Sequence, residues 1–248
     1  MTTTELIWFI LLTNIAEILG TVGGFGSSVY FVPMASYFMD FQSVLGITAL
    51  YHLSSNLSKI GFFRKGIDRE LIIYLGLPAI LLVILGAWMS KWLAPVWLGL
   101  GLGVFLLTFS LWMLWKRNAT ITPSRKNALA GGAVSGFIAG LLGTGGAVRG
   151  AVMTSFNLNK DKFVATSAII DMGIDLSRTV VYAQNGYMHK HDFYLVPILI
   201  VISIAGTFIG KKILDRISQT QFRKLVLLLL LGIALFTLSM HVYRVLEV

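Results

Sequence analysis

Four long apolar runs constrain this chain more than any other feature. Each is close to the roughly 20 residues that a helix needs to cross the hydrocarbon core of a bilayer. Only 12% of the residues are charged, whereas a soluble domain carries about 25%. We therefore predict an all-α polytopic membrane protein. The four runs are Leu71–Met89, Pro95–Trp115, Tyr194–Gly210 and Leu225–Met240.

Several classes of function are excluded at this stage. The net charge of +9 comes from Lys and Arg scattered over short loops, which indicates retention of those loops in the cytoplasm and no binding of nucleic acid. The chain has no cysteine, so it has no disulfide and no thiolate metal site. It carries no HExxH, GxSxG or P-loop motif. We expect no enzymatic activity, no cofactor and no metal site, and we assign His189 and His191, in a predicted loop, no function.

The chain contains an internal duplication with an offset of 119 or 120 positions. The matches extend from a glycine cluster near the start of each half to a proline and a Gly-to-Lys segment further on. We predict two repeats, 1–118 and 119–248. The matched pairs are Gly20–Gly26 with Gly140–Gly146, Asn56–Lys59 with Asp175–Arg178, Pro78 with Pro197, and Gly86–Lys91 with Gly206–Lys211.

Each half has the same predicted plan. A long apolar stretch interrupted by glycines comes first, and we expect no cleavable signal peptide before it. Three ordinary spans follow. The broken stretches are 6–39 and 127–158, and the spans are 43–63, 70–90 and 95–115, then 162–183, 192–210 and 219–243.

The distribution of basic residues indicates how the broken stretches run. If each enters and returns as two half-helices, most loop Lys and Arg fall on one side, and only Lys91, Lys190 and Arg244 fall on the other. Cytoplasmic loops are enriched in Lys and Arg. We therefore predict re-entrant helical hairpins, two inverted repeats and both termini outside the cytoplasm, an architecture of many secondary transporters.

Two polar stripes lie at equivalent repeat positions. His52, Asn56 and Lys59 are spaced i, i+4, i+7, and Asp171, Asp175 and Arg178 repeat that spacing. Such residues share one helix face. Polar groups within a membrane are costly, which favours a functional role. The alternative is that Asp171, Asp175 and Arg178 pair with one another and only hold helices together. We expect Lys59 toward the inner mouth and Arg178 toward the outer mouth.

The glycine segments predict an anion site. Half-helix N-termini carry free N–H groups and partial positive charge. Ser27 and Ser28 follow the first segment, and the cation Arg149 follows the second. The alternative is close helix packing through small residues. Glu17, in the first broken stretch, is a candidate to titrate or to pair with a cation.

These motifs resemble the TauE/SafE sulfite exporter family. The resemblance rests on Gly23–Gly26 leading to Val32 and Pro33, on Gly143–Gly146 and on Ala165–Ser167, and it covers nearly the whole chain. It implies a bacterial inner-membrane carrier that exports sulfite, sulfonates or related sulfur oxyanions. The chain departs from the family pattern at Gly46–Thr48, Met153 and Arg149. An added cation at Arg149 suits a divalent anion or a carboxylate-bearing sulfonate.

We therefore predict a secondary transporter that exports a sulfur oxyanion by alternating access, with proton coupling as an open question. Its partners are the small anion and the lipid bilayer, and a homodimer is left open. Rival interpretations are an anion channel, a carrier of another anion such as a carboxylate, a sodium-coupled carrier, and a sensor without flux. Candidate substrate-binding residues are Gly24, Phe25, Gly26, Ser27, Ser28, Thr48, His52, Asn56, Gly145, Gly146, Arg149, Thr166 and Asp171, and candidate coupling or gating residues are Glu17, Lys59, Asp175 and Arg178.

Overall fold

The computed structural model describes residues 1–24, 26–64, 66–115, 121–216 and 231–243. Every regular element among them is helical, and four helices are long and apolar enough to cross a membrane, as predicted for an all-α membrane protein. Those four are Thr3–Gly23, Arg69–Trp92, Pro95–Trp115 and Leu195–Leu214. The elements are α1 (Thr3–Gly23), α2 (Ser28–Phe38), α3 (Phe41–Phe62), α4 (Arg69–Leu71), the π-helical turn η1 (Ile72–Gly76), α5 (Leu77–Met89), η2 (Ser90–Trp92), α6 (Pro95–Trp115), α7 (Arg125–Leu142), α8 (Gly146–Thr154), α9 (Lys160–Gln184), η3 (Lys190–Asp192), α10 (Leu195–Leu214) and a last helix, Leu231–Tyr243.

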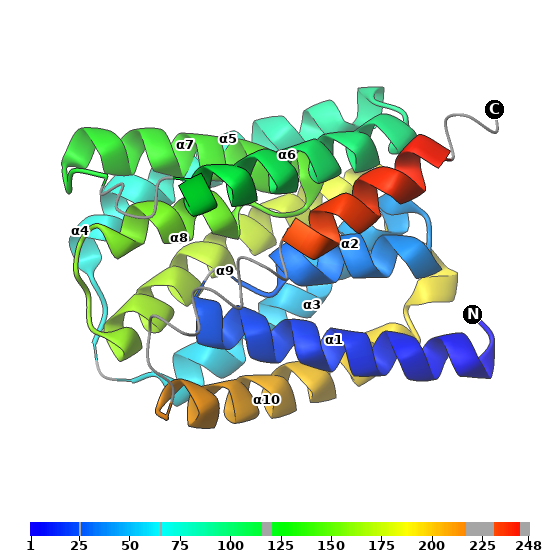
Figure 1. Ribbon diagram of the computed structural model, residues 1–248, viewed down its shortest axis with the longest axis horizontal. Coiled ribbons are helices and arrows are strands. Elements are labelled where there is room, and N and C mark those ends of the chain that lie inside the picture. The colour runs from blue at the N-terminus through cyan, green and yellow to red at the C-terminus, as the bar shows by residue number, and fades with distance from the viewer. Residues whose placement is uncertain (25, 65, 116–120, 217–230, 244–248) are drawn as a thin grey trace.

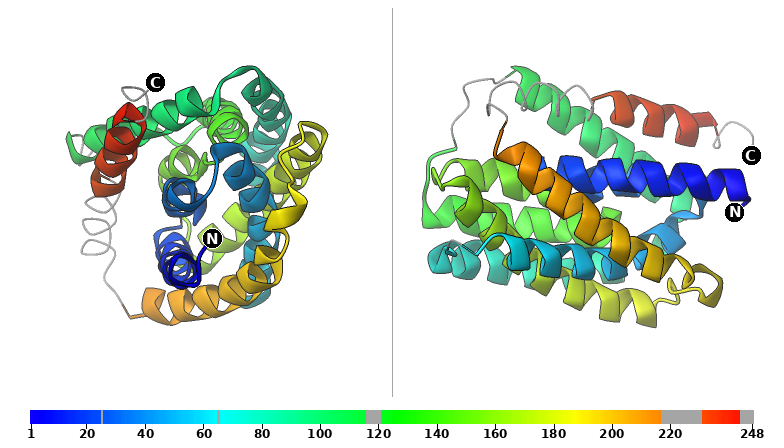
Figure 2. Two further views of the ribbon diagram at one scale, coloured as in Figure 1. Left: turned by 90° about the vertical axis from the view of Figure 1, so that its right-hand side faces the viewer. Right: turned by 90° about the horizontal axis from the view of Figure 1, so that it is seen from below.

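The long helices run roughly along the longest axis of the molecule (Figure 1). The start of α1 and the end of the last helix lie at the same end, on the right of Figure 1. Viewed from that end, α1 appears almost end-on, whereas α10 runs across the view, and in the view from below α10 lies obliquely across α1 (Figure 2). Both termini of the described chain are therefore on one side.

Glycines interrupt both of the stretches that the sequence marks as broken. Gly24 and Gly26 adopt positive φ angles of 68° and 83°, and Gly143 adopts 79°. These angles lie in the left-handed region, which glycine enters without a steric penalty. After the first break α2 turns back toward the end where α1 starts (Figure 1).

The arms of these broken stretches differ in length from the prediction of two half-helices. The first arm, α1, has 21 residues, which at 1.5 Å per residue is about 31 Å and enough for a full crossing. The returning arm α2 has only 11 residues, and α8 has 9 against 18 in α7. Each stretch is therefore one long helix followed by a short helix.

The two stripe-bearing helices, α3 and α9, pack against each other in opposite directions. The hydroxyl of Ser43, near the start of α3, lies 2.6 Å from Nδ1 of His189, which follows the end of α9. At the other end Phe63, just after α3, clusters with Val164 and Ala165 near the start of α9. Neither helix is among the four apolar spans, because each carries a polar face that is buried between helices.

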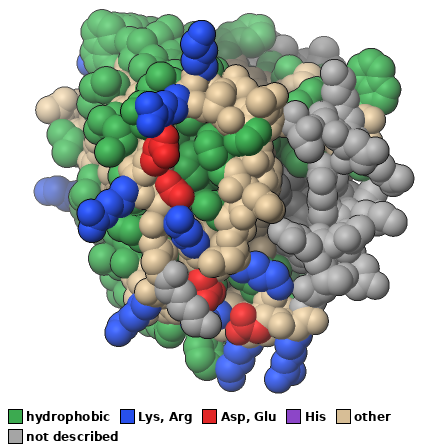
Figure 3. Space-filling model, turned by 90° about the vertical axis from the view of Figure 1, so that its left-hand side faces the viewer, with side chains coloured by type: hydrophobic (Ala, Val, Ile, Leu, Met, Phe, Trp, Pro, Cys, Tyr) green, Lys and Arg blue, Asp and Glu red, His purple; other side chains and the backbone are tan. Residues whose placement is uncertain are grey.

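The end where α3 finishes and α9 begins is the basic end. Lys and Arg side chains gather on this face (Figure 3). Lys162 lies 3.0 Å from Asp68, and Arg125 lies 2.8 Å from Glu70. Partial burial raises the pKa of Asp68. The hydrogen bond from the N–H of Leu71 and the nearby Lys162 ammonium lower the pKa by more, so the pKa of Asp68 is below its ordinary value. The predicted gathering of the basic loops at one end is present in the fold.

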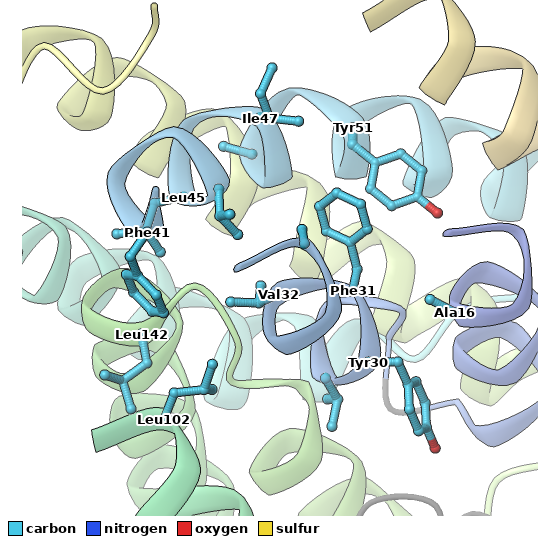
Figure 4. Close-up of a cluster of buried hydrophobic side chains, with 14 of the residues drawn as sticks. Ala16, Tyr30, Phe31, Val32, Phe41, Leu45, Ile47, Tyr51, Leu102 and Leu142 are labelled. Carbon is cyan, nitrogen blue, oxygen red and sulfur yellow. The ribbon is translucent and has the colours of Figure 1, made fainter. Parts of the chain in front are cut away.

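The short helix α2 lies inside an apolar cluster. Val29, Tyr30, Phe31 and Val32 are all buried, and Figure 4 shows several of these side chains between α2 and its neighbours. The Phe31 and Tyr51 rings are 4.9 Å apart between centroids, which joins α2 to α3. This packing fixes the start of α2, where Ser27 and Ser28 lie.

Close helix contacts depend on glycine at the interface between α5 and α7. A β-carbon added at Gly136 would lie 2.1 Å from the carbonyl oxygen of Ala79. Backbone cannot move away as a flexible side chain can, so the two helices must separate. The α5–α7 contact therefore requires a residue without a side chain at this position.

We expect Gly136→Ala to destabilise the protein, with overpacking costing about 1–3 kcal/mol. Thermal unfolding in detergent, followed by circular dichroism, measures the effect. The matched control is Gly232→Ala, where an added β-carbon meets nothing within 4 Å. Equal melting temperatures for the two variants would show that the α5–α7 contact is looser than described.

Candidate functional site

The carboxylate of Glu17 on α1 is completely buried and forms the first polar cluster, the Glu17 cluster. Nζ of Lys59 on α3 lies 2.8 Å from Oε1 of Glu17. Hydroxyl groups from four elements complete its surroundings. The donors to Glu17 are Ser55 at 2.7 Å, Thr207 at 3.0 Å and Thr21 at 3.3 Å on Oε1, and Tyr51 at 2.6 Å and Ser27 at 2.7 Å on Oε2.

This cluster explains how a carboxylate is held away from water. A buried charge is costly unless it is paired and its remaining lone pairs accept hydrogen bonds, and Glu17 has both. Lys59 is buried as well and also donates to Ser55 at 2.5 Å. Lys59 is therefore enclosed in the Glu17 cluster in this conformation. Its location toward the inner mouth stays a prediction.

The second polar cluster, the Asp175 cluster, lies on α9. Nη2 of Arg178 is 2.7 Å from Oδ1 of Asp175, and Nδ2 of Asn56 donates to Oδ2 at 2.6 Å. Nη1 of Arg178 donates to the carbonyl oxygens of Gly143 at 2.7 Å and Ala139 at 3.3 Å. These are orphan carbonyls at the C-terminal end of α7, which cations stabilise.

Arg178 is therefore a buried cap for the end of α7. Its location toward the outer mouth stays a prediction. His52 links the two clusters, because Nε2 lies 3.2 Å from Oγ of Ser27 and Nδ1 lies 3.9 Å from Oδ2 of Asp175. The face of α3 that carries the predicted stripe thus contacts both carboxylates. The stripe prediction located these groups, but their partners come mostly from other helices.

The third group is the Arg149 pair, formed by Arg149 on α8 and Asp171 on α9. Nη2 of Arg149 donates to Oδ2 of Asp171 at 2.5 Å, Nη1 contacts Oδ1, and Nε donates to Ser167 at 3.2 Å. This is the parallel two-point contact that a guanidinium makes with a carboxylate or another oxyanion. The Arg149 side chain is 2% exposed, whereas that of Asp171 is 15% exposed.

The two glycine breaks meet beside the Arg149 pair. The hydroxyl of Thr144, in the second break, donates to Oγ of Ser28, at the start of α2, at 3.2 Å. A β-carbon built on Gly26 would lie 3.7 Å from Nη2 of Arg149 and 3.9 Å from Oδ2 of Asp171. Glycine at position 26 therefore leaves the space next to the guanidinium open.

A small cavity, the central cavity, adjoins this junction. Its volume is about 10 Å³, which is room for about one water molecule. Asp171 and Lys59 both line it, so it connects the Arg149 pair with the Glu17 cluster. The lining residues are Gly20, Gly24, Gly26, Lys59, Val164, Ser167, Ala168 and Asp171.

The charges at the site balance. Glu17, Asp171 and Asp175 are each paired with one cation among Lys59, Arg149 and Arg178. We predicted Arg149 as a direct ligand of substrate oxygens, but in this conformation the Asp171 carboxylate is bound to it. The side of the guanidinium that a substrate oxyanion would use is therefore occupied by Asp171 in this conformation.

Two predicted contact residues have their hydroxyls turned elsewhere. The Thr48 hydroxyl donates to Val44 O within its own helix at 2.5 Å, and the Thr166 hydroxyl accepts from the N–H of Asp68 at the basic end. The Thr48 bond is the common one from a helical threonine to the preceding turn. Of the predicted glycines, Gly145 packs against the Ser135 carbonyl, and Gly24 lies against the ring of Phe163. Gly146 is buried at the first position of α8, and Phe25 lies outside the described residues.

Other residues of the site were missed in the sequence. Tyr51 and Ser55 lie on the same face of α3 as His52 and Lys59, so the helical spacing contained a signal for them. Ser167 is next to the predicted Thr166. Thr207 offers no such signal, because only the packing of α10 against α1 brings it to Glu17.

The sequence profile described as sulfite exporter TauE/SafE matches residues 9–237. The chain belongs to this family. The predicted resemblance is confirmed, and this TauE/SafE-family protein is a membrane protein of a transporter family whose implied cargo is sulfite or a related sulfur anion. The family is not enzymatic. No curated protein and no solved structure matches the chain.

The Glu17 cluster of this TauE/SafE-family protein is open to a stability test. We expect Lys59→Met to be strongly destabilising, because breaking a buried pair costs about 3–5 kcal/mol. The double variant Glu17→Gln/Lys59→Met removes both charges, so it should recover most of the lost melting temperature. Thermal unfolding in detergent makes the comparison.

Lys91→Met is the matched control for that experiment, because Lys91 is exposed. We expect its melting temperature to be close to that of the wild type. A double variant as unstable as Lys59→Met would mean that the hydroxyl network, and not the charge pairing, dominates the stability of this cluster.

Proposed function

We propose that this protein is a secondary transporter that exports sulfite or a small organosulfonate by alternating access, with Arg149 as the anion-binding group. The observation that carries the proposal is the two-point contact between Arg149 and Asp171 at the junction of the two glycine breaks. A carboxylate stands there in the place that a substrate oxyanion would take. Gly26 and Ser28 lie beside it and supply space and a hydroxyl group.

The small volume of the central cavity fits a carrier in a closed conformation. Room for about one water molecule is too little for sulfite, so the site must open before substrate binds. Gly24 and Gly26, in the first glycine break, line this cavity, so rearrangement of that break would open it.

We propose that the halves 1–118 and 119–248 are inverted repeats. Their matching helices make matching contacts: α1 packs on α10 as α7 packs on α5, and α3 packs on α10 as α9 packs on α5. Gly206 lies against Glu17, and Gly86 lies against Phe137. The two contacts are equivalent, because Gly86 and Gly206 are 120 positions apart, as are Glu17 and Phe137. Asn56 and Asp175, equivalent by an offset of 119, bond each other directly. Such a contact fits a pseudo-two-fold axis between the antiparallel helices α3 and α9.

This symmetry supports alternating access, because inverted repeats can exchange conformations to open one side and then the other. We place the basic end in the cytoplasm, as the positive-inside rule directs, and both termini on the outside. The membrane in question is the bacterial inner membrane, where the membrane potential favours exit of an anion by about 2.3 kcal/mol per charge per 100 mV.

Arg149 can be released from Asp171 in two ways, which differ in whether a proton is transported with the anion. A proton on Asp171 removes its charge, so an anion that binds Arg149 then moves together with a proton. Alternatively, Asp171 turns toward Lys59, which lines the same cavity, and no proton moves. The first route makes flux depend on a pH gradient, and the second does not.

The chemistry of the site admits one close rival. A guanidinium binds carboxylates as well as sulfur oxyanions, so a carrier for a small carboxylate uses the same geometry. Competition between sulfite and acetate for uptake into proteoliposomes separates the two. An anion channel with the same lining would show flux that does not saturate with substrate concentration.

We expect Arg149→Ala to reduce sulfite flux into proteoliposomes by at least about tenfold, because a hydrogen bond to a charged group is worth about 1.5–3 kcal/mol. Arg149→Lys should retain part of the flux, since a lysine keeps the charge and loses the two-point geometry. Radiolabelled sulfite and a small sulfonate are the probes.

The matched control is Arg125→Ala, an exposed arginine paired with Glu70 at the basic end. It should transport like the wild type.

Arg149→Ala/Asp171→Asn removes both buried charges, so it separates loss of the site from misfolding. If this double variant folds and transports sulfite like the wild type, the proposed site is contradicted. Asp171→Asn should abolish any dependence on a pH gradient if Asp171 carries the proton.

The absence of cysteine permits a direct test of orientation, because an introduced cysteine is the only thiol. We expect Lys91→Cys to react with a membrane-impermeant maleimide in intact cells. Glu70→Cys, exposed at the basic end, should react only after the cells are permeabilised. The opposite pattern would reverse the proposed orientation.

A further inference from the structure

A second cluster of chemically active side chains lies far from the central cavity, at the end of the molecule opposite the basic end. It consists of His189, His191 and Asp192, in and just before the short helix η3 that precedes α10. The two imidazole rings stack, with centroids 5.3 Å apart and planes 7° from parallel. One ligand atom from each residue lies within 4.8 Å of those of the other two.

Both histidines face the same carboxylate. Nδ1 of His189 lies 3.8 Å from Oδ2 of Asp192, and Nε2 of His191 lies 3.4 Å from Oδ1. These distances exceed those of good hydrogen bonds. Each imidazole therefore lies near a different oxygen of the carboxylate without a close hydrogen bond to it.

The burial of Asp192 is the second observation that points to a ligand. The residue is only 5% exposed, and its Oδ2 has no hydrogen-bond partner among the described residues. A buried carboxylate oxygen without a donor is costly. A cation between Asp192 and the two imidazoles would offset that cost.

We propose that His189, His191 and Asp192 bind a divalent transition-metal ion of the Zn²⁺ class. Two imidazoles and one carboxylate form a common zinc ligand set, with water in the fourth position. Imidazole nitrogen disfavours Ca²⁺ and Mg²⁺, which take oxygen ligands. The His191 side chain is 74% exposed, so the ion enters directly from the aqueous phase. This site is separate from the anion site and from its function.

A structural clasp is the competing explanation for the same residues. The Ser43 hydroxyl lies 2.6 Å from Nδ1 of His189, which ties the loop before α10 to the start of α3. A metal bound at Nδ1 would replace this bond. The two explanations differ in their consequences: a clasp needs Ser43 and binds no metal, whereas a metal site binds the ion with or without the Ser43 hydroxyl.

Isothermal titration of the full chain with ZnCl₂ in detergent tests the proposal, with a purification tag that contains no histidine. We expect one saturable Zn²⁺ per chain. His191→Asn should weaken binding by at least about tenfold, since loss even of outer-shell partners costs 10–100-fold. His191 is exposed, so this variant should fold normally. Zn²⁺ should also raise the melting temperature of the wild type and not that of His191→Asn.

Two control variants sharpen the result. Lys190→Ala lies between the two histidines and should leave the affinity unchanged, and Ser43→Ala should bind Zn²⁺ at least as tightly as the wild type. Wild-type protein without saturable binding, or His191→Asn with wild-type affinity, would overturn the proposal. Binding is measured without any flux, so the outcome does not depend on the proposed transport function.

Discussion

The cost of a charge that has lost its water determines the interior of this protein. In the described part of the helix bundle, Glu17, Asp171 and Asp175 are paired with Lys59, Arg149 and Arg178, respectively. The pairs join α1 to α3 and α8 to α9, and Arg178 also ties α9 to the end of α7. In a bilayer no solvent can replace a missing partner, so these contacts determine which helices are neighbours.

The glycine breaks have a place in this interior that their composition alone does not explain. They let α2 and α8 begin in the middle of the molecule, where Thr144 and Ser28 bond each other and Gly26 leaves room beside Arg149. A continuous helix would fill that space. The same feature therefore shapes the fold and leaves space beside the buried guanidinium, where the proposed anion site lies.

The two halves keep a common frame but differ in their chemistry. Lys59 and Arg178 are equivalent, yet Lys59 pairs with Glu17 from α1, whereas Phe137 stands at the corresponding position of α7. In the second half the acid is Asp175, where the first half has Asn56. Each half thus has one buried acid for its cation, placed differently. The Arg149 pair has no counterpart in the first half, which is why the proposed function places substrate exchange there.

The sequence alone determined the membrane class, the family and the positions of the fully described spans to within a few residues, because hydropathy and helical spacing are local properties of the chain. The first part of the predicted span 219–243 lies outside the described residues, and the division into two repeats stays a prediction. The tertiary structure decided which side chains form ion pairs and hydrogen bonds with each other. Asp171 binds Arg149 from α8, Thr207 of α10 reaches Glu17 of α1, and Thr48 and Thr166 turn away from the site. A buried charge takes whichever partner the packing of distant helices brings within about 3 Å, and no spacing along one helix contains that information.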